Sequence, residues 1–509
     1  MLSVVKMVLF VSAMLVPAKH ALHIFQQNSY IVSRYLEWLK ENALLRIKAA
    51  WLPVCAALIF RYPVPALVFL LMYGLYTEHK ASYRKPLVYT ARVKRQIAVE
   101  AVLVLILCAV LLKLRADAFL PALSLILPWL LVIPVGWITA PIERGVQQSF
   151  LNDAKRILAE QSGMIRIGIT GSYGKTSTKN VIQAVLSEKY NSLMTPASFN
   201  TPMGITRTIR EYMKPIHKVF VCEMGADKPG DISELMEFVH PTIGIVTSIG
   251  PQHLATFGSQ EKITYEKMRM VEELPPEGTA ILNYDNEIIR NYQIQNPVRV
   301  ITYGIHCPEA DYRAEDISYS ENGSRFTIVH GDERVEITSP LLGELNILNI
   351  LSAAACGRLL DVDWNAVRRG IRTMKPVEHR LERKTIGGRR FIDDAFNANP
   401  SGAHMALNVL SMMPGRRWIV TPGMIELGDR QEEINHDFGM QMKGQCDEVI
   451  LVGPVQTRPV LEGLQDAGFD AEHIRTVDGI EEAMRIVFAE TTAEDTILLE
   501  NDLPDAFNH

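Results

Sequence analysis

The chain has 509 residues, enough for about three domains, and 48% of them are hydrophobic while 21% are charged. This balance excludes both an intrinsically disordered chain and a uniformly apolar one. The 52 Lys and Arg against 57 Asp and Glu give a net charge of -5, so the basic surplus typical of nucleic-acid binding is missing. The 6 scattered cysteines form no CxxC pair, which argues against a disulfide framework and a zinc site.

Apolar residues are concentrated in residues 1–145, which we predict to be a transmembrane helical region of about four or five apolar segments. The strongest segment, Ala118 to Ile142, contains no charged residue and is long enough for a hydrocarbon core of about 30 Å. The other candidates are Gln96–Leu112, Ala49–Phe60, Tyr62–Thr77 and Met7–Ala18. The two segments between 49 and 77 could form a hairpin, a re-entrant pair or one kinked helix. The first segment is alternatively a cleaved signal peptide.

Basic residues cluster in three stretches between and after these segments: residues 34–48, 80–95 and 144–156. Loops rich in Lys and Arg favour the cytoplasmic side. We therefore expect a multi-pass membrane protein whose large C-terminal part lies in the cytoplasm. The membrane segments are either a simple anchor or part of the surface that holds a lipid-linked substrate.

Short β-branched runs alternate with helix-like stretches from Ile165 onward, which predicts βαβ units and an α/β fold with a mostly parallel sheet. The predicted strands are Ile165–Thr170, Lys218–Cys222, Ile243–Ser248, Thr279–Leu282, Arg417–Thr421 and Glu448–Val452. The stretch 303–337 shows the alternation of antiparallel β structure. A break near 374–382 divides this part into a central domain, 160–378, and a C-terminal domain, 379–509.

A glycine-rich loop follows the first of these strands and precedes an amphipathic helix. Gly171 and Gly174 permit backbone conformations that let several N–H groups point at a phosphate, and the following helix adds its positive end. Lys175 would supply a movable cation, and the Thr176 hydroxyl is placed to bind Mg²⁺. A glycine-rich turn with an incidental lysine is the alternative. The residues expected to surround the phosphates are Gly171, Ser172, Tyr173, Gly174, Lys175, Thr176 and Ser177.

The string TGSYGKTSTK, starting at Thr170, resembles the Mur ligase family, the ATP-dependent amide ligases of peptidoglycan synthesis. The resemblance continues in order to about residue 455 and is closest to the members that add D-Ala-D-Ala. Its further strings are SFNTPMG at 198–204, EMGA at 223–226, HLATFGS at 253–259, NYDN at 283–286, DDAFNANP at 393–400 and MIELG at 424–428. It implies a P-loop central ATPase domain and a Rossmann-like C-terminal α/β domain.

The resemblance also implies a chemistry. The family transfers the ATP γ-phosphate to a carboxylate, and an amine then displaces phosphate from the acyl phosphate. By this resemblance Lys175, Glu223, His253 and Lys267 would be catalytic. Thr176, Glu223 and His253 would bind Mg²⁺, and Lys267 would be carbamylated. The alternatives are a surface carboxylate for Glu223, a capping or core histidine for His253 and a solvated lysine for Lys267.

Asn346 and Asn349 match the residues with which the family holds adenosine, although Leu345 stands where the family usually has His. Arg380 would reach ribose or phosphate, and Asp394 would accept a ribose hydroxyl. Helix capping is the alternative for Asn346, and an ion pair with a neighbouring glutamate is the alternative for Arg380.

Two departures leave the substrates open. The hydrophobic region stands where soluble members carry a small UDP-binding domain. At residues 500–505 the acidic ENDLPD replaces a KGSR-like stretch and reverses its charge. Asn397 and Asn399 could line the amine side. We expect ATP, a small-molecule or lipid-linked cell-wall precursor and an amino acid or dipeptide as substrates, and no nucleic acid.

Three functions compete: a ligase adding an amine such as D-Ala-D-Ala to a peptidoglycan precursor, a Mur-type ligase with a lipid-linked or polyglutamate substrate, and a membrane-tethered nucleotide switch or ATPase. ADP release that requires both an acid and an amine would indicate a ligase.

Overall fold

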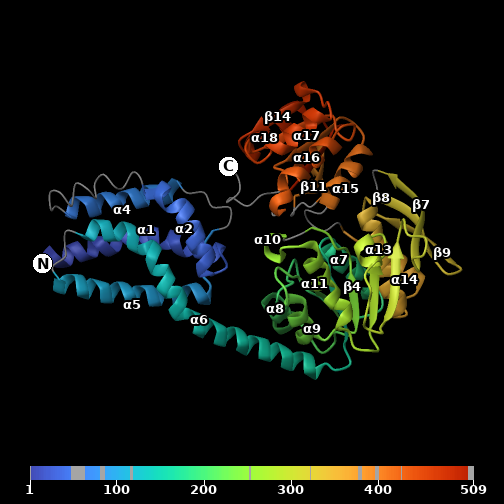
Figure 1. The fold of residues 1–509 in the computed structure, drawn as a ribbon, viewed down its shortest axis with the longest axis horizontal. Helices are drawn as coiled ribbons and strands as arrows, with labels where there is room; N and C mark the ends of the chain where they lie inside the picture. Colours follow the sequence, from blue (N-terminus) through green and yellow to red (C-terminus); the bar gives the residue numbers. More distant parts are fainter. Residues whose placement is uncertain are drawn as a thin grey trace. The chain divides into compact units, whose positions relative to one another are not determined.

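The computed structural model describes residues 2–47, 63–80, 86–114, 119–251, 254–320, 323–375, 381–395, 400–425 and 427–501. The chain divides into two units, Met1–Phe150 and Leu151–His509. The first unit is helical and the second contains two β-sheets with their helices (Figure 1).

The described part of the first unit consists of long helices rich in apolar residues. They are α1 (Leu2–Gln27), α2 (Val32–Ile47), α4 (Pro63–Lys80), α5 (Ala91–Leu114) and α6 (Leu120–Glu160), the last of which continues into the second unit. Among described residues, three helical stretches are long and apolar enough to cross a membrane: Val4–Gln27, Ala91–Leu114 and Leu120–Glu160. Helix α4 covers the predicted segment 62–77 from Pro63 onward but is not among these three, and the segment 49–60 lies outside the described residues.

Helix α6 contains the strongest predicted apolar segment and continues far beyond the expected end at Ile142. The residues after 142 include no proline or glycine pair that would stop a helix, and the last turns gain side-chain pairs three and four residues apart. Arg156 donates to Asp153 at 2.9 Å and to Glu160 at 2.8 Å. Near the charged end of the apolar segment, Arg95 on α5 forms a two-pronged ion pair with Glu143 on α6, at 2.6 and 2.8 Å.

The larger sheet has nine strands in the order β2-β3-β1-β4-β5-β6-β7-β8-β9. Along this order, every pair of neighbours from β2 through β1 to β7 is parallel. The last three strands, β7, β8 and β9, pair antiparallel, as the alternation in 303–337 predicts. The strands are β1 (Ile165–Thr170), β2 (Ser192–Met194), β3 (Val219–Glu223), β4 (Ile243–Val246), β5 (Thr279–Asn283), β6 (Arg299–Gly304), β7 (Tyr312–Ser320), β8 (Gly323–His330) and β9 (Glu333–Ser339).

Helices cover both faces of this sheet and bury two separate apolar clusters. Helices α7 (Lys175–Ser187), α13 (Glu344–Leu359) and α14 (Trp364–Arg372) pack on one face, where their Val, Ile, Leu and Ala side chains meet the strand residues. Helices α8 (Pro202–Tyr212), α9 (Asp231–Val239) and α11 (Gln260–Glu272) pack on the other face. Two further helices are single turns, α10 (Leu254–Phe257) and α12 (Glu287–Arg290).

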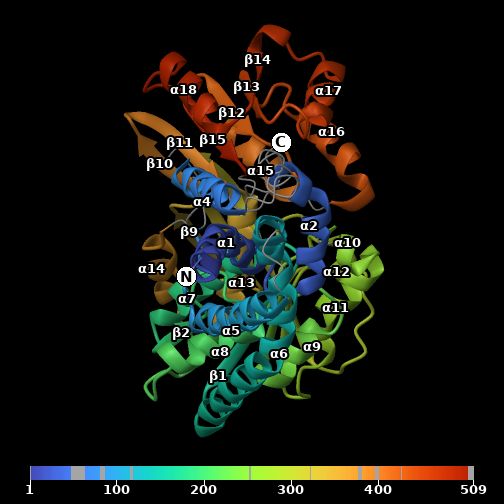
Figure 2. The same cartoon turned by 90° about the vertical axis from the view of Figure 1, so that its left-hand side faces the viewer.

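The second sheet has six strands in the order β10-β11-β15-β12-β13-β14, parallel except for the β10–β11 hairpin. Helices α15 (Pro400–Ser411), α16 (Gln431–Gln441) and α17 (Arg458–Asp466) cover one face, and α18 (Ile480–Glu490) covers the other (Figure 2). The strands are β10 (Glu382–Ile386), β11 (Arg389–Asp394), β12 (Arg417–Thr421), β13 (Glu448–Val452), β14 (Ile474–Val477) and β15 (Thr496–Glu500).

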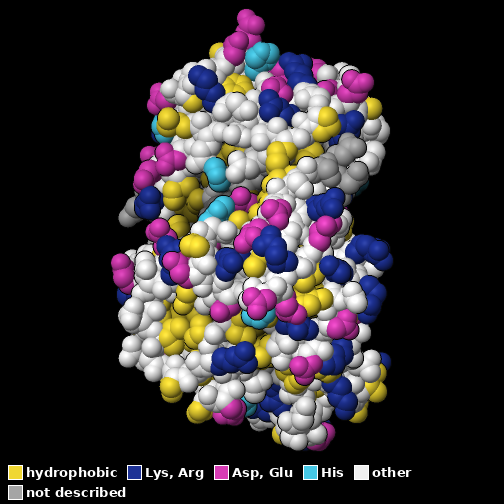
Figure 3. All heavy atoms as spheres, turned by 90° about the vertical axis from the view of Figure 1, so that its right-hand side faces the viewer, with side chains coloured by type: hydrophobic (Ala, Val, Ile, Leu, Met, Phe, Trp, Pro, Cys, Tyr) yellow, Lys and Arg dark blue, Asp and Glu magenta, His cyan; other side chains and the backbone are white. Residues whose placement is uncertain are grey.

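On the face drawn in Figure 3, Lys and Arg side chains alternate with Asp and Glu side chains and with small hydrophobic areas. No area of a single charge sign dominates this face.

Candidate active site

The loop between β1 and α7 lies at the centre of the nine-stranded sheet. Strand β1 is flanked by β3 on one side and β4 on the other, so the direction in which strands are added reverses there. Open α/β sheets bind ligands outside the carboxyl ends of the strands at such a point. Gly171 and Gly174 have φ values of 149° and 81°, in the region that favours glycine. Gly174 directly precedes α7, so the free N–H groups of that helix face the loop.

The loop is held from the β4 side by hydrogen bonds. The Ser172 N–H donates to the Ser248 carbonyl at 2.7 Å, and the Tyr173 N–H donates to the Ser248 hydroxyl at 3.0 Å. The Ser172 hydroxyl donates to Gly250 O at 3.0 Å, and the Tyr173 hydroxyl donates to Pro251 O at 2.5 Å. Burial raises the pKa of the Tyr173 phenol, which keeps it a donor. Hydrogen bonds to residues 248–251 therefore hold the loop in place.

Lys175 lies across this loop. Its Nζ donates to the carbonyl oxygens of Gly171 at 2.6 Å and Ser172 at 3.1 Å, both within the glycine-rich segment. Ser177, one helical turn further along α7 than Gly174, is buried. The predicted loop residues thus lie together in one continuous segment, and a cation accompanies the N-terminal end of α7.

Glu223 is the last residue of β3, and its side chain is only 1% exposed. Its Oε1 accepts hydrogen bonds from the Thr176 hydroxyl and from the Asn200 side-chain amide, both at 3.1 Å. Its Oε2 accepts from Lys179 Nζ at 2.9 Å. The structure therefore brings together Thr176 and Glu223, two of the three residues expected to bind the metal.

Lys179 and Asn200 were not among the predicted site residues. Lys179 has no exposed side-chain surface, and it also donates to the Ala197 carbonyl. One signal was in the sequence: Lys179 follows Lys175 by four residues, which is one turn along the same helix. Asn200 lies in one of the family-like strings, but its contact with Glu223 depends on the pairing of distant segments.

The oxygen donors at this point fit Mg²⁺ better than a transition metal. Magnesium takes hard oxygen ligands and keeps water and substrate phosphates among them, so it needs few protein groups. The Thr176 hydroxyl and the Glu223 carboxylate are such groups. Within the described ranges, no group of three or more His, Cys, Asp or Glu side chains could hold a metal ion.

Lys267 is buried on α11, with 2% of its surface exposed. Burial and, to a smaller extent, the nearby positive charge of Lys175 lower its pKa to about 7, although the charges of Glu266, Asp227 and Asp231 act in the opposite direction. The Glu266 carboxylate accepts hydrogen bonds from the backbone N–H groups of Gly230 and Ile232, at 2.8 and 2.7 Å. Near pH 7 a large fraction of Lys267 is therefore the neutral amine, the form that reacts with CO₂.

Asn346 and Asn349 lie on adjacent turns of α13. The Asn349 amide donates to Asn346 Oδ1 at 3.3 Å, and the Thr178 hydroxyl donates to Asn349 Oδ1 at 2.7 Å. Asn346 donates to the Leu342 carbonyl at 2.9 Å, whereas the residue that caps α13 is Gly343. Asn349 thus connects α13 with the helix that follows the phosphate loop.

Asp394 is the last residue of β11 in the C-terminal sheet, and it is half-buried. Its Oδ1 accepts from the Leu381 N–H at 3.0 Å. Four other predicted residues lie outside the described residues: His253, Arg380, Asn397 and Asn399.

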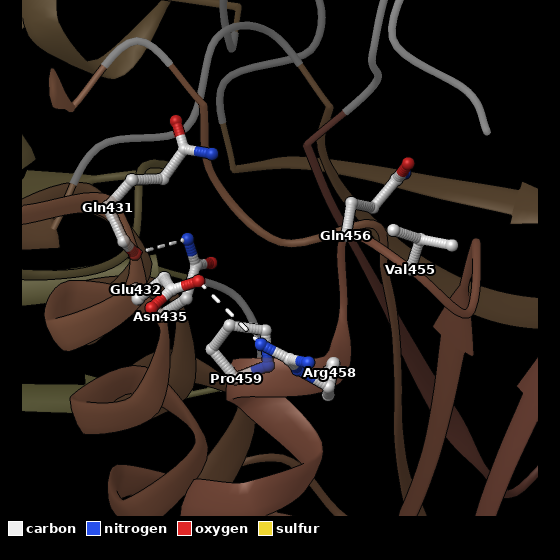
Figure 4. Close-up of a pocket in the computed structure, with 7 residues that line it drawn as sticks. All are labelled: Gln431, Glu432, Asn435, Val455, Gln456, Arg458 and Pro459. Atoms are coloured by element: carbon white, nitrogen blue, oxygen red, sulfur yellow. Dashed lines mark hydrogen bonds and ion pairs between the residues drawn. The ribbon is translucent and has the colours of Figure 1, made fainter. Parts of the chain in front are cut away.

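One cavity of about 110 Å³ lies in the C-terminal domain, between the start of α16 and the segment that enters α17. Its lining is Gln431, Glu432, Asn435, Val455, Gln456, Arg458 and Pro459 (Figure 4). Asn435 donates to Gln431 O at 2.9 Å, and Arg458 faces Glu432 at 3.7 Å. None of the predicted site residues lines this cavity, so it is separate from the candidate site.

Comparison with known proteins gives two matching family models and a set of relatives. Residues 169–357 match the Mur ligase middle domain, and residues 379–500 match the Mur ligase, glutamate ligase domain. The UDP-N-acetylmuramoyl-tripeptide–D-alanyl-D-alanine ligase of Escherichia coli K12 is 29% identical over 326 residues, 62% of this chain and 72% of that protein. The Bacillus subtilis 168 protein of the same name is 32% identical over 293 residues, 57% of this chain and 62% of that protein.

Solved structures show the same fold. MurF from Acinetobacter baumannii matches with a TM-score of 0.62 at 23% identity, over 70% of this chain and 77% of that one. MurF ligase from Thermotoga maritima, in complex with ADP, matches with a TM-score of 0.62 at 23% identity, over 70% and 80%. The resemblance noted in the sequence is confirmed, and because the two matched domains together span more than half of the sequence, the chain belongs to the Mur ligase family.

Proposed function

We propose that this protein is an ATP-dependent carbon–nitrogen ligase that joins the carboxylate of a peptidoglycan precursor to an amine such as D-Ala-D-Ala. The observation that carries the proposal is the contact between Thr176 and Glu223 beside the glycine-rich loop, at the point where the strand order reverses. Two of the relatives carry this reaction in their names.

The residues of the chain have separate tasks in this reaction. The N–H groups of the loop and of α7 hold the ATP phosphates, and Lys175 moves from the loop carbonyls to the transferred phosphoryl group. Thr176 and Glu223, together with His253 by the family resemblance, would hold Mg²⁺, which would neutralise phosphate charge when bound. The carboxylate then leaves this step as an acyl phosphate, and the amine displaces phosphate from it.

Lys267 and the adenosine-side residues complete the proposed site. The buried, partly neutral amine of Lys267 fits carbamylation, which would convert a cation into a carboxylate-like group. Asn346, Asn349, Arg380 and Asp394 are assigned to adenosine and ribose by the family resemblance. Two domains, 160–378 and 379–509, would close over the acyl phosphate and exclude water.

We further propose that the first unit is a multi-pass membrane region and that the ligase domains lie in the cytoplasm. The length and composition of α1, α5 and α6 support this, together with the basic residues next to α5 and α6. A lipid-linked precursor is the alternative acid substrate, because a membrane region stands where a UDP-binding domain is expected. Carbonate washing of membranes that contain the full chain tests the placement: an integral protein stays in the pellet.

The test of the reaction uses the full chain in detergent with Mg-ATP, UDP-N-acetylmuramoyl-tripeptide and D-Ala-D-Ala. A parallel reaction replaces the UDP-linked acid with its polyprenyl-linked counterpart. We expect ADP release to require both an acid and an amine, and the amide product to appear in equal amount. ADP release that needs neither substrate would contradict the proposal and indicate an ATPase.

A further inference from the structure

Lys179 is a fully buried lysine one helical turn beyond Lys175, on the helix that follows the glycine-rich loop. Its ammonium group donates to Glu223 Oε2 at 2.9 Å and also to the carbonyl oxygen of Ala197. Ala197 has a φ of 42°, a left-handed backbone conformation that is uncommon for a residue with a Cβ. Two partners from different segments of the chain thus hold the ammonium group beside the carboxylate.

The two oxygens of Glu223 have different kinds of partner. Oε1 accepts from the Thr176 hydroxyl and the Asn200 amide, which are both neutral. Oε2 accepts from the charged Lys179, and such charge-assisted hydrogen bonds are roughly twice as strong as neutral ones. Breaking the bond to Oε2 would also leave a buried ammonium group without its ion-pair partner, which is costly. Oε1 is therefore the oxygen that can be released to a ligand.

The chemistry of the donors leads to the same assignment. A hydroxyl group carries lone pairs as well as a proton, so Thr176 can turn its oxygen toward a cation that binds at Oε1. An ammonium group has only donors and a full positive charge, so Lys179 repels a cation at Oε2. Thr176 also lies in the first turn of α7, next to the glycine-rich loop, whereas Lys179 lies three residues further along that helix. A divalent ion near the loop would thus meet one oxygen of Glu223.

The segment 195–200 keeps this arrangement in place. The backbone N–H of Glu223 donates to the Thr195 hydroxyl at 3.1 Å, and the N–H of Gly225 donates to the Asn200 carbonyl at 2.9 Å. The Asn200 side chain lies so close to Gly225 that a Cβ atom at that position would be 2.8 Å from Asn200 Cγ. The segment is therefore packed against the end of β3, and the carboxylate has little freedom to turn its second oxygen toward an ion.

We propose that Lys179 is a positioning residue that leaves Glu223 a single oxygen for a divalent ion and so makes the site select Mg²⁺ against Ca²⁺. This inference rests on the proposed function, in which Thr176 and Glu223 hold the ion that accompanies ATP. Mg²⁺ is small, requires nearly octahedral geometry and binds few carboxylate oxygens beside phosphates and water. Ca²⁺ takes about six to eight oxygen ligands and often uses both oxygens of one carboxylate. Occupation of Oε2 by Lys179 removes that second oxygen and disfavours the larger ion.

The test measures nucleotide binding with each ion in the full-length enzyme. Isothermal titration calorimetry gives the Kd of a non-hydrolysable ATP analogue in excess MgCl₂ and in excess CaCl₂, and the readout is the ratio of the two Kd values. The ratio does not depend on the fraction of folded protein, because that fraction changes only the number of binding sites.

The main variant is Lys179→Met, and Asn200→Ala is its matched control. Asn200→Ala removes a bond to the same carboxylate, but at Oε1, so the second oxygen stays occupied by the lysine. Lys179→Gln is a second variant, which removes the charge but keeps a polar group in the buried position and thus places less strain on folding.

For the wild type we expect a Kd at least about 10-fold lower with Mg²⁺ than with Ca²⁺. In Lys179→Met the ratio should shift by about 10-fold toward Ca²⁺, the scale on which residues behind a metal ligand act. Lys179→Gln should shift the ratio in the same direction, and Asn200→Ala should keep the wild-type ratio.

An unchanged ratio in the lysine variants, or an equal shift in Asn200→Ala, would overturn the inference. A wild type that binds the two nucleotide complexes equally well would also overturn it, but would leave the proposed ligase function intact. A wild type that binds the nucleotide with neither ion would instead overturn nucleotide binding at this loop, and the ligase function with it.

Discussion

Glu223 and Glu500 occupy the same position in the two sheets but differ in what surrounds them. Each is the last residue of a parallel strand, and each is 1% exposed. Glu223 accepts hydrogen bonds from a hydroxyl, an amide and a lysine. Glu500 has no hydrogen-bond partner among the described residues. The first carboxylate is compensated by three side chains of the protein, while no described residue donates a hydrogen bond to the second.

The difference separates two ways of using a buried carboxylate. The groups around Glu223 fix its orientation before any ligand binds, which suits a position for a metal ion and phosphates. Glu500 has no hydrogen-bond partner among the described residues, and burial together with the charge of Asp394 raises its pKa, which favours the neutral carboxyl group. Both arrangements would lie in one enzyme, one on each domain.

The largest effect is expected at the loop beside Glu223. Lys175→Ala removes the cation that we propose neutralises the transferred phosphoryl group, so the rate of acid-dependent ADP release should fall by about 1,000-fold. The amide product should fall in parallel. Lys189→Ala, at an exposed lysine after the end of α7, serves as the control and should keep the wild-type rate. Full activity in Lys175→Ala would remove the basis for assigning phosphoryl transfer to this loop.

A stability measurement tests whether Glu223 is compensated as the structure indicates. Lys179→Met leaves Glu223 buried without its ammonium partner, so the free energy of unfolding should drop by about 3 kcal/mol. Lys155→Met breaks only an exposed pair with Glu237 and should change little. Denaturant unfolding followed by fluorescence measures both variants. Equal stability of Lys179→Met and the wild type would mean that the two strand-end carboxylates do not differ in this way.

Lys267 gives a test through pH and CO₂. Because its pKa is about 7, the neutral amine that can be carbamylated becomes the minor form below that pH. Activity should therefore decline as the pH falls below about 7, decline on removal of CO₂ and return on addition of bicarbonate. Lys267→Arg should be slow and should not respond to bicarbonate. A wild-type rate that is independent of bicarbonate in CO₂-free buffer would exclude carbamylation.

The smallest expected effect concerns the stability contributed by Glu500. Its folded-state pKa is raised above the unfolded value of about 4.3, so the unfolded chain binds fewer protons once the pH exceeds 4.3. The wild type should thus lose stability as the pH rises from there toward the folded-state pKa. Glu500→Gln should lack this loss and be more stable than the wild type at pH 8, by on the order of 1 kcal/mol. Thermal unfolding across pH measures the slope, and identical slopes would show that Glu500 is compensated.

Local patterns were sufficient to predict much of the fold. The β-branched runs at Ile165–Thr170, Arg417–Thr421 and Glu448–Val452 form strands with those bounds, because each is a short apolar run between turn residues. Several other strands, namely β2, β6, β10, β11, β14 and β15, were not predicted as strands, although β6 is itself a β-branched run. The end of α6 was misplaced for a related reason: the loss of apolar character after Ile142 marks the end of an apolar segment, not the end of a helix.

In the candidate site, too, the residues of a contiguous segment could be predicted and those brought together by tertiary structure could not. The glycine-rich loop is contiguous in sequence, so its residues could be identified together, and the contact of Thr176 with Glu223 follows from adjacent parallel strands. Lys179 and Asn200 could not be assigned, because what gives them a role is the approach of segments 20 to 45 residues away in the chain. The isolation of Glu500 was also unpredictable. The sequence shows a reversed charge there, but only the tertiary structure shows that, among the described residues, neither oxygen of Glu500 has a hydrogen-bond partner.

The three hydrogen bonds to Glu223 have a practical consequence for handling the protein. Since Thr176, Asn200 and Lys179 donate hydrogen bonds to this carboxylate, we expect Glu223 to stay compensated in the folded protein without a divalent ion. Purification in EDTA should therefore yield a fully folded preparation that regains turnover as soon as magnesium is restored. Such a preparation allows nucleotide affinity to be titrated without hydrolysis, and it provides a clean starting point for measuring how much each added ion contributes.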